Sequence, residues 1–362
     1  MYRSNFLIKC TGFSLILLSA NTFAGTMGAA TIQLSIPDLK PGFEANGAVL
    51  WLKPGASNLN YVILNKELPA QSPTWSEQEL KPSYAPGFEL GLGYVIPNGG
   101  GKDLQVHWTH LTTSTSSSVS APNSSYFLGP DYEIGPGGLP IRNATGKVKF
   151  KYDTIDLNAG QYLNFGEQLR LRFLGGLSAG FLREEVSADY SGSRPAGPYA
   201  GPFNMNQKVT SNFSGVGPQL GLHADYVSHY GFGLLGEGTV SALIGGLKTN
   251  TKYVGSGVEL QTVYNQSINY QTIKDETVTQ VIPGLSGKLG VNYNRVIKND
   301  MLFKIEAGYQ AAVYMNAISQ YLPSSLVLGQ GLESGGIFVA TMNHTLSNYS
   351  VHGPFLNFSL KC

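Results

Sequence analysis

The fold of this chain is constrained most by the order of long and short connections between segments in which apolar and polar residues alternate. Ten segments carry apolar and polar residues in alternation, the period-two pattern of β-strands. They are residues 43–52, 88–96, 104–111, 147–163, 168–184, 208–226, 232–247, 277–293, 301–318 and 348–361. The connections between them are in turn long and short, beginning and ending with a long one. If neighbouring strands run antiparallel, all the short turns lie at one end of the sheet and all the long loops at the other.

This arrangement predicts an all-β fold, a transmembrane antiparallel β-barrel with short periplasmic turns and long extracellular loops. About ten strands are expected, with 8–12 compatible with the pattern. Lipid cannot hydrogen-bond to open strand edges, so the sheet must close on itself. Residues 43–362 are expected to form this barrel, after a periplasmic lead-in over 25–42.

The first hairpin shows which face meets lipid. Residues 88–96 and 104–111 flank the turn Asn98-Gly-Gly-Gly101, and their even positions, such as Leu92 and Trp108, are large and apolar. A hairpin of this kind suits either a half-buried soluble sheet or a barrel wall. The order of the connections favours the wall, with the even positions facing lipid and the odd positions facing the interior.

Composition supports a chain that shows much of its surface to something other than water. Only 13% of the residues are charged, against about 25% in soluble domains. After the N-terminus no apolar run reaches the roughly 18 residues of a transmembrane helix. The net charge of +1, without a basic stripe interleaved with aromatics, argues against nucleic acid as a partner.

Residues 1–24 resemble a secretory signal peptide, with Arg3 and Lys9 before a short apolar core and small residues ending at Ala24. A first core helix is the weaker interpretation, because the apolar run is short and glycine follows. Cleavage after Ala24 would remove Cys10 and leave Cys362 unpaired. Cys362 is then either a free thiol or a possible intermolecular disulfide.

The odd-and-even assignment places a set of polar side chains inside the barrel. Acids outnumber bases in this set by seven to four, which predicts a weak preference for cations if the lumen conducts. Arg170 and Arg172 are expected to pair with Asp156, with Glu167 as a further partner. The predicted lumen-lining residues are Glu44, Glu89, Asp103, Gln105, His107, Asp156, Arg170, Arg172, Gln219, His223, Asp225, Glu237, Lys288, Lys304 and Glu306.

Two catalytic patterns occur and are better explained structurally. Gly176-Leu-Ser-Ala-Gly180 matches G-x-S-x-G, but Ser178 lies within an alternating segment rather than on a strand-to-helix turn. Gly231-Phe-Gly-Leu-Leu-Gly236 matches G-x-G-x-x-G, but its first glycine belongs to a hairpin turn. No catalytic, cofactor-binding or metal-binding residue is predicted.

The histidines allow one alternative. His107 and His110 are three apart, so a strand places them on opposite faces and they cannot share a metal. His223 and Asp225 share the inner face, where such a pair can activate water. A lumen-lining polar pair is the preferred interpretation, and a barrel-embedded hydrolase remains the least favoured one.

Blocks spread along the chain resemble the Legionella-type major outer membrane protein family. They are Gly25-Thr-Met-Gly28, Val49-Leu-Trp-Leu-Lys-Pro54 with Leu59-Asn-Tyr61, the lone Trp75, Pro86-Gly-Phe-Glu-Leu-Gly-Leu-Gly-Tyr94, Asp103-Leu-Gln-Val-His-Trp-Thr-His-Leu111, Tyr152-Asp-Thr-Ile-Asp-Leu157 and His352-Gly-Pro-Phe-Leu-Asn357. Each block alone is loose, while their order is specific. The resemblance implies an abundant outer-membrane barrel of a Gram-negative intracellular bacterium that lets small solutes through.

Two functions follow from this sequence. The first is a porin-like barrel for passive diffusion of small hydrophilic solutes, and the second is a structural and adhesive surface protein with a plugged lumen and loops that contact host molecules. Outer-membrane lipid and lipopolysaccharide are expected partners in both cases, and a homo-oligomer is compatible with either. No cofactor is expected.

Overall fold

The computed structural model describes residues 41–66, 74–130, 140–194, 201–228, 231–256, 262–263, 266–267, 270–274, 276–297, 301–328 and 337–362. The predicted signal peptide and nearly all of the predicted lead-in lie outside these residues. Every regular element in the described part of the chain is a β-strand. Among the same residues, no helix is long and apolar enough to cross a membrane.

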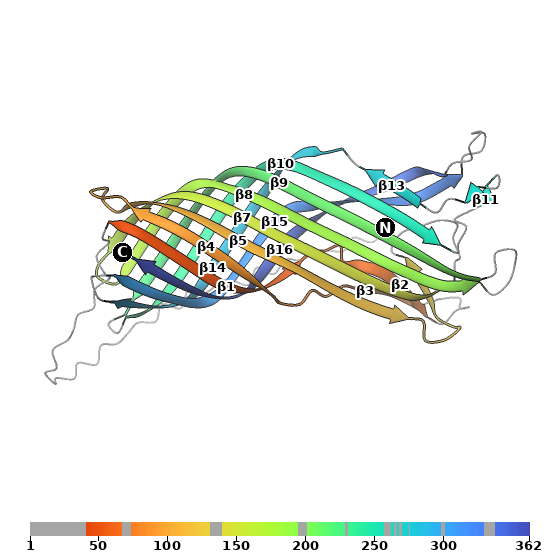
Figure 1. The fold of residues 1–362 in the computed structure, drawn as a ribbon, viewed down its shortest axis with the longest axis horizontal. Coiled ribbons are helices and arrows are strands. Elements are labelled where there is room, and N and C mark those ends of the chain that lie inside the picture. The colour runs from red at the N-terminus through yellow and green to blue at the C-terminus, as the bar shows by residue number, and fades with distance from the viewer. Residues whose placement is uncertain are drawn as a thin grey trace, which may run out of the picture. The chain divides into compact units, whose positions relative to one another are not determined.

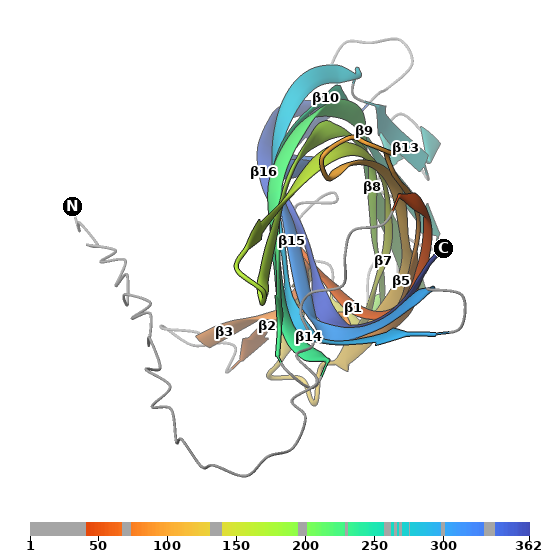
Figure 2. The ribbon, with the colours of Figure 1, turned by 90° about the vertical axis from the view of Figure 1, so that its left-hand side faces the viewer.

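Ten long strands close into an antiparallel ring (Figures 1 and 2), which confirms the predicted barrel. Each strand pairs with the next long strand of the chain, and the last pairs with the first. The ring consists of β1 (Gly42–Gly55), β4 (Ala85–Val95), β5 (Lys102–Ser120), β7 (Ile141–Phe165), β8 (Leu169–Arg194), β9 (Gly201–Val227), β10 (Phe232–Ser256), β14 (Val278–Val296), β15 (Leu302–Leu328) and β16 (Ile337–Lys361).

Shorter strands lie at the end of the barrel where the long connections are, here called the long-connection end. In the first connection β2 (Asn60–Lys66) pairs with β3 (Thr74–Glu79) and with β6 (Phe127–Pro130) of the second. In the fourth, β13 (Tyr270–Lys274) pairs with β10, and β11 (Thr262–Val263) pairs with β12 (Gln266–Ser267).

The opposite end, here called the short-turn end, holds the tight turns and the C-terminus. Gly166, in the turn between β7 and β8, has φ +67° and Gly231, between β9 and β10, has φ +81°. Glycine adopts this left-handed conformation without the steric cost that a Cβ would bring. The backbone N–H of Cys362 donates to the carbonyl of Phe43 at 2.9 Å, so the chain ends beside the start of β1.

The predicted strand ends fall short at the long-connection end. Loops are expected over 112–146, 185–207 and 319–347, and a long polar connection over 248–276 into which the alternation allows the flanking strands to extend. Much of each range belongs to the paired strands β5, β7, β8, β9, β10, β15 and β16. These stretches lack an apolar outer face and therefore look like loops in the sequence. Backbone hydrogen bonds between strands form whether or not the outer face is apolar. Beyond the lipid the outer face of these strands meets water, so its side chains are polar.

The outer surface carries an apolar band that stops about halfway up the long strands. On β8 its exposed members are Phe173, Leu177 and Phe181, and Arg183 is the next residue on the same face. Aromatic residues rim the band at both edges, as in membrane barrels. The rim at the short-turn end includes Phe43, Phe165, Tyr226 and Phe232, and the opposite rim includes Trp51, Tyr84, Trp108 and Tyr309.

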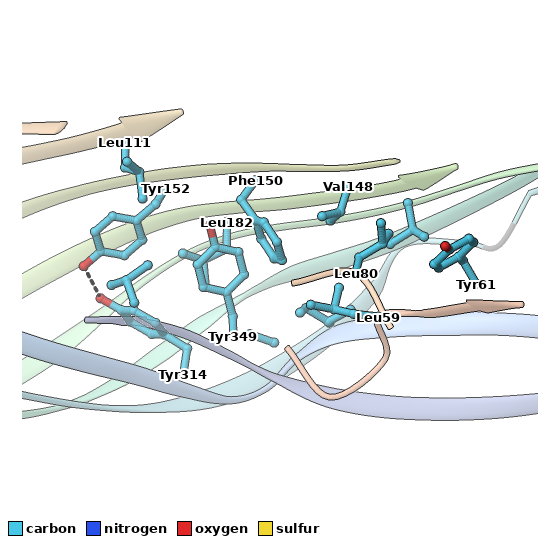
Figure 3. Packing of buried hydrophobic residues seen from close by; sticks show 14 of the residues in the cluster. Leu59, Tyr61, Leu80, Leu111, Val148, Phe150, Tyr152, Leu182, Tyr314 and Tyr349 are labelled. Carbon is cyan, nitrogen blue, oxygen red and sulfur yellow. Dashed lines mark hydrogen bonds between the residues drawn. The ribbon is translucent and has the colours of Figure 1, made fainter. Parts of the chain in front are cut away.

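Inside the barrel, the half near the long connections is mainly apolar. Val148, Phe150 and Tyr152 of β7 point inward and are at most 6% exposed. They pack against Leu182 of β8 and Tyr349 of β16 in one buried cluster (Figure 3). Lipid faces the outside of one half of the barrel, while an apolar core fills the inside of the other half.

Candidate functional site

A cavity of about 190 Å³ lies inside the membrane-spanning half of the barrel. Thirteen of the fifteen predicted interior residues line it. The other two, Asp103 and Arg170, are also buried, at 2% and 9% exposure. The lining residues from the predicted set are Glu44, Glu89, Gln105, His107, Asp156, Arg172, Gln219, His223, Asp225, Glu237, Lys288, Lys304 and Glu306.

An ion pair crosses the cavity between β4 and β14, which three other strands separate along the shorter way around the ring. Lys288 Nζ lies 2.8 Å from both carboxylate oxygens of Glu89. His107 Nδ1 approaches the same carboxylate at 3.6 Å, and the Thr109 hydroxyl donates to it at 3.4 Å. Glu89 is therefore held by partners from two other strands, the neighbouring β5 and the distant β14.

A second pair joins β5 to β8. Arg172 Nη2 lies 2.9 Å from Asp103 Oδ2, and the two side chains are 5% and 1% exposed. The predicted pairing of Arg172 with Asp156 is wrong, because the β7–β8 register sets Asp156 opposite Ser178 and Arg172 opposite Tyr162. Arg170 Nε donates to Asn164 Oδ1 at 2.9 Å.

A third cluster surrounds Asp225 of β9. Lys304 Nζ of β15 lies 3.0 Å from Asp225 Oδ1 and also pairs with Glu306. His223 Nε2 lies 3.0 Å from Asp225 Oδ2, and His223 Nδ1 lies 3.1 Å from Glu237 Oε2. Carboxylates only accept hydrogen bonds, so both imidazole nitrogens act as donors and His223 is a cation between two anions.

This arrangement argues against the hydrolase alternative. A histidine that activates water needs a free ring nitrogen to take the proton, and both nitrogens of His223 face carboxylates. Ser178 lies within β8, paired with Asp156 and Gly217 across its two neighbours, and not at a strand-to-helix turn. Among the described residues, no group of three or more His, Cys, Asp or Glu side chains is arranged to hold a metal ion.

Lys361 is a further interior base that is absent from the predicted set. It lies opposite Glu44 in the β1–β16 ladder, on the same face of β16 as the cavity residues Asn357 and Ser359. Side chains two residues apart on a strand share a face, so the position of Lys361 two residues after Ser359 predicts that it points inward. With Lys361 the interior holds seven acids against five bases, and the protonated His223 adds a sixth positive charge.

His110, by contrast, lies on the outer surface as its spacing from His107 predicts. Its Nδ1 is 2.6 Å from Asp153 Oδ1 on β7, and its ring packs against Phe88 with centroids 5.2 Å apart. This pair is at the lipid boundary near the long-connection end. It has no contact with the cavity.

Tyrosines close the cavity toward the long-connection end. The hydroxyls of Tyr152 and Tyr314 lie 3.2 Å apart, and Figure 3 shows the two rings pointing toward one another. β7 and β15 are five strands apart in a ring of ten, so this contact spans the full width of the barrel. The ring of Tyr349 stacks on Tyr152 at 6.2 Å and extends the layer.

Buried residues of the first connection pack beyond the tyrosines. Leu59, Tyr61 and Leu80 are at most 2% exposed, although they belong to a segment predicted as an extracellular loop. The ring of Tyr61 lies on the backbone of Gly146, where a Cβ would come within 2.5 Å of it. Residues 56–66 and 74–80 of this segment are here called the plug.

Two polar contacts fasten the plug to β8, and one of them is the hydrogen bond that the Tyr190 hydroxyl donates to the carbonyl of Tyr61. Asn58 Nδ2 donates to Glu184 Oε1 at 2.7 Å, and Glu184 is 2% exposed. Glu184 lies past Phe181, the last lipid-facing apolar residue of β8. Burial raises the pKa of Glu184 to about 8, although the Asn58 hydrogen bond opposes the shift. Glu184 was not singled out in the sequence, where it sits at the end of a predicted strand.

The outer half of β15 also bends into the barrel. Asn316 has φ +58°, and the β15–β16 register shifts between Tyr314 and Ile318. Beyond this bulge β15 contacts β9 and β10 in place of its neighbour β14: the Ser319 N–H donates to Ser211 Oγ at 3.0 Å, and the Thr249 hydroxyl donates to the Ser319 carbonyl at 3.1 Å. The bulge thus narrows the interior of the barrel in the half near the long-connection end.

Solved structures of outer-membrane barrels are among those similar to the chain. They include the outer membrane protease OmpT from Escherichia coli (12% identity, 90% of this chain and 97% of that one, TM-score 0.38). A TodX mutant described as a monoaromatic hydrocarbon channel matches at 7% identity over 88% and 90% of the two chains, with a TM-score of 0.28. A Pseudomonas aeruginosa FadL homologue matches at 11% identity over 88% and 90%, with a TM-score of 0.23.

No curated protein matches the chain by sequence. The model of one protein family, described as the Legionella pneumophila major outer membrane protein precursor, matches residues 35–362. This range includes all ten strands of the barrel and every residue of the cavity. The chain belongs to the Legionella major outer membrane protein family and is a β-barrel of the bacterial outer membrane.

Proposed function

We propose that the protein is a porin-like barrel for small hydrophilic solutes whose pathway is closed in this conformation by the plug. The observation that carries the proposal is the charged cavity inside the membrane-spanning half. Taking charged groups out of water is costly, and apolar residues of similar volume stabilise a purely structural interior at least as well. A lumen that keeps seven acids and five bases is suited to contact with water and solutes.

The gate in this proposal is the layer formed by the tyrosines and the plug. The contact between the Tyr152 and Tyr314 hydroxyls at 3.2 Å crosses the lumen below the plug. The plug is attached to the barrel by side-chain packing, by hydrogen bonds from Asn58 to Glu184 and from Tyr190 to Tyr61, and by the short ladder between β2 and β6. Its displacement from the barrel would open the interior toward the long-connection end.

The finer expectations from the sequence are part of this proposal. The protein is not an enzyme, since the histidine best placed for catalysis is held between two carboxylates. Its lumen prefers cations weakly, since acids outnumber bases there. Most of these charges are paired, so the expected preference is small.

A second candidate function is a structural surface protein with a permanently plugged lumen. The contacts that span the barrel favour it, because Tyr152, Tyr314 and Tyr349 are buried and their rings contact one another across the interior. In this case the exposed connections would contact host molecules and the lumen would never conduct.

Planar-bilayer recording separates the two functions. We expect the wild-type protein to show rare openings and a variant with residues 57–80 replaced by a short glycine-serine linker to show steady conductance steps. The matched control is Glu77→Ala on exposed β3, which should behave as wild type. A silent linker variant that migrates as a folded barrel would refute the porin proposal and favour the structural one. The reversal potential in a salt gradient would report the cation preference.

A further inference from the structure

A patch of basic side chains lies on the outer surface of β7–β10, just beyond the apolar band. It is here called the basic patch. Three acids, Asp153, Glu185 and Asp189, share this surface. The patch consists of Lys147, Lys149 and Lys151 of β7, Arg183 of β8, Lys208 of β9, and Lys248 and Lys252 of β10.

Strand register brings these residues together. The ladder sets Lys151 opposite Arg183, Arg183 opposite Asn212, and Asn212 opposite Lys248, in one row across four strands. Lys147, Ser187, Lys208 and Lys252 form a parallel row four residues further from the membrane. Strand pairing therefore gathers basic residues from distant parts of the sequence on one continuous surface.

The centre of the patch holds more positive charge than its acids neutralise. Lys208, Arg183 and Lys149 all surround Glu185, with nitrogen–oxygen distances of 2.8, 3.1 and 3.3 Å. Burial opposes ionisation of Glu185, but the hydrogen bond and charge of Lys208, together with Arg183 and Lys149, lower its pKa. One carboxylate thus faces three cations, whose side chains remain 40–51% exposed.

The patch also has a defined height relative to the membrane. On β8, Arg183 is two residues beyond the lipid-facing Phe181, and on β7, Lys151 is four residues beyond Ile155. At about 3.3 Å per residue along a strand, the first basic row is about 7–13 Å from the edge of the apolar band. Lipid headgroups occupy this depth in a bilayer.

We propose that the basic patch binds the phosphate groups of lipid A, the glycolipid base of lipopolysaccharide, in the outer leaflet of the membrane. The long-connection end faces this leaflet, and its lipid carries phosphates on a sugar headgroup directly above the acyl chains. Clustered Lys and Arg beside a membrane attract such anions, and Arg can bind phosphate through two hydrogen bonds. The acyl chains of the same molecule would then lie on Ile155, Phe181 and Val216, which are 44–54% exposed.

The test compares two triple variants of the full-length protein in detergent micelles titrated with fluorescent lipid A. Lys149→Gln, Arg183→Gln and Lys208→Gln together should weaken binding by roughly tenfold to a hundredfold, because each basic residue near an anionic lipid surface contributes on the order of fivefold. The control removes three basic side chains outside the patch: Lys53→Gln, Lys102→Gln and Arg295→Gln. It should bind lipid A as the wild type does.

Dephosphorylated lipid A and free inorganic phosphate complete the experiment. We expect the wild type to bind the dephosphorylated lipid as weakly as the patch variant does, and millimolar phosphate not to compete with lipid A. Equal binding by the two triple variants would overturn the proposal, as would unchanged affinity for the dephosphorylated lipid. Competition by free phosphate would overturn the lipid as the occupant. Heat-modifiable migration on gels verifies that each variant forms the barrel.

Discussion

The membrane-spanning half of this barrel and the half beyond it have opposite polarity. In β7, Ile155 and Leu157 face lipid while Thr154 and Asp156 face the cavity. A few residues earlier in the same strand, the outward side chains are Lys149 and Lys151 and the inward ones are apolar. The ladder with β8 is regular from Asn143 to Phe165, so no backbone irregularity accompanies the change.

The difference shows that solvent, rather than strand geometry, decides which face of a strand is apolar. Where lipid surrounds the sheet, apolar residues face outward and the interior can remain polar. Where water surrounds it, the interior must be apolar to stabilise the fold, as in a soluble protein. The alternation persists through β7, but the apolar residues move from odd positions to even ones between Ile155 and Tyr152.

The largest expected effect tests whether the polar interior depends on pairing. Asp103→Leu leaves Arg172 as an unpaired charge in a buried site, which should lower the free energy of unfolding by about 3–5 kcal/mol. Adding Arg172→Met should recover most of this loss, because the double variant buries no charge. Urea denaturation in micelles measures both. A double variant as unstable as the single one would contradict the explanation.

In the water-surrounded half, truncation of the apolar core should cost nearly as much. Leu80→Ala removes a fully buried side chain that packs the plug inside the barrel, and we expect a loss of about 2–5 kcal/mol. Trp75→Ala on β3 is the matched control. Trp75 is 63% exposed, so its loss should change stability by about 0.5 kcal/mol or less. Similar costs for both would indicate that the plug does not pack inside the barrel in solution.

A lysine placed on the outer surface distinguishes the two halves directly. Leu92→Lys puts a charge against lipid and should destabilise the barrel by roughly 2–4 kcal/mol, depending on depth. Ser118→Lys puts the same charge on the outer surface of β5 beyond the lipid and should lie within about 0.5 kcal/mol of wild type. Refolding equilibria in vesicles measure the difference. An equal cost at both positions would place the lipid boundary elsewhere.

A further expected effect concerns the pH dependence of plug attachment. The carboxyl of Glu184 has its pKa raised from an ordinary value of 4.5 to about 8 by burial. Between these pH values the folded state holds a proton that the unfolded state has lost, so stability should fall as pH rises from about 4.5 to 8. Glu184→Gln should remove this part of the slope in thermal unfolding. An unchanged slope would mean that Glu184 ionises freely in the folded protein.

Much of the fold could be predicted from local pattern. The ten alternating segments, the short turns such as that at Gly166 and the inward orientation of residues such as Glu89 and His223 all follow from the period of a strand. Only neighbouring residues and the side of the sheet are needed for such predictions. The ends of strands such as β8 and β9 could not be predicted, because outside lipid their outer face resembles a loop.

Pairing partners and the plug were decided by tertiary structure alone. Arg172 meets Asp103 rather than Asp156, and Lys288 meets Glu89 across the cavity, because strand register and ring closure set distances between residues far apart in the sequence. In the sequence Leu59, Tyr61 and Leu80 belong to a predicted loop. They are buried because the closed barrel has an apolar interior against which they pack. The sequence by itself determined which way each side chain points, since that depends on the strand period, while the closed ring determined what each one meets.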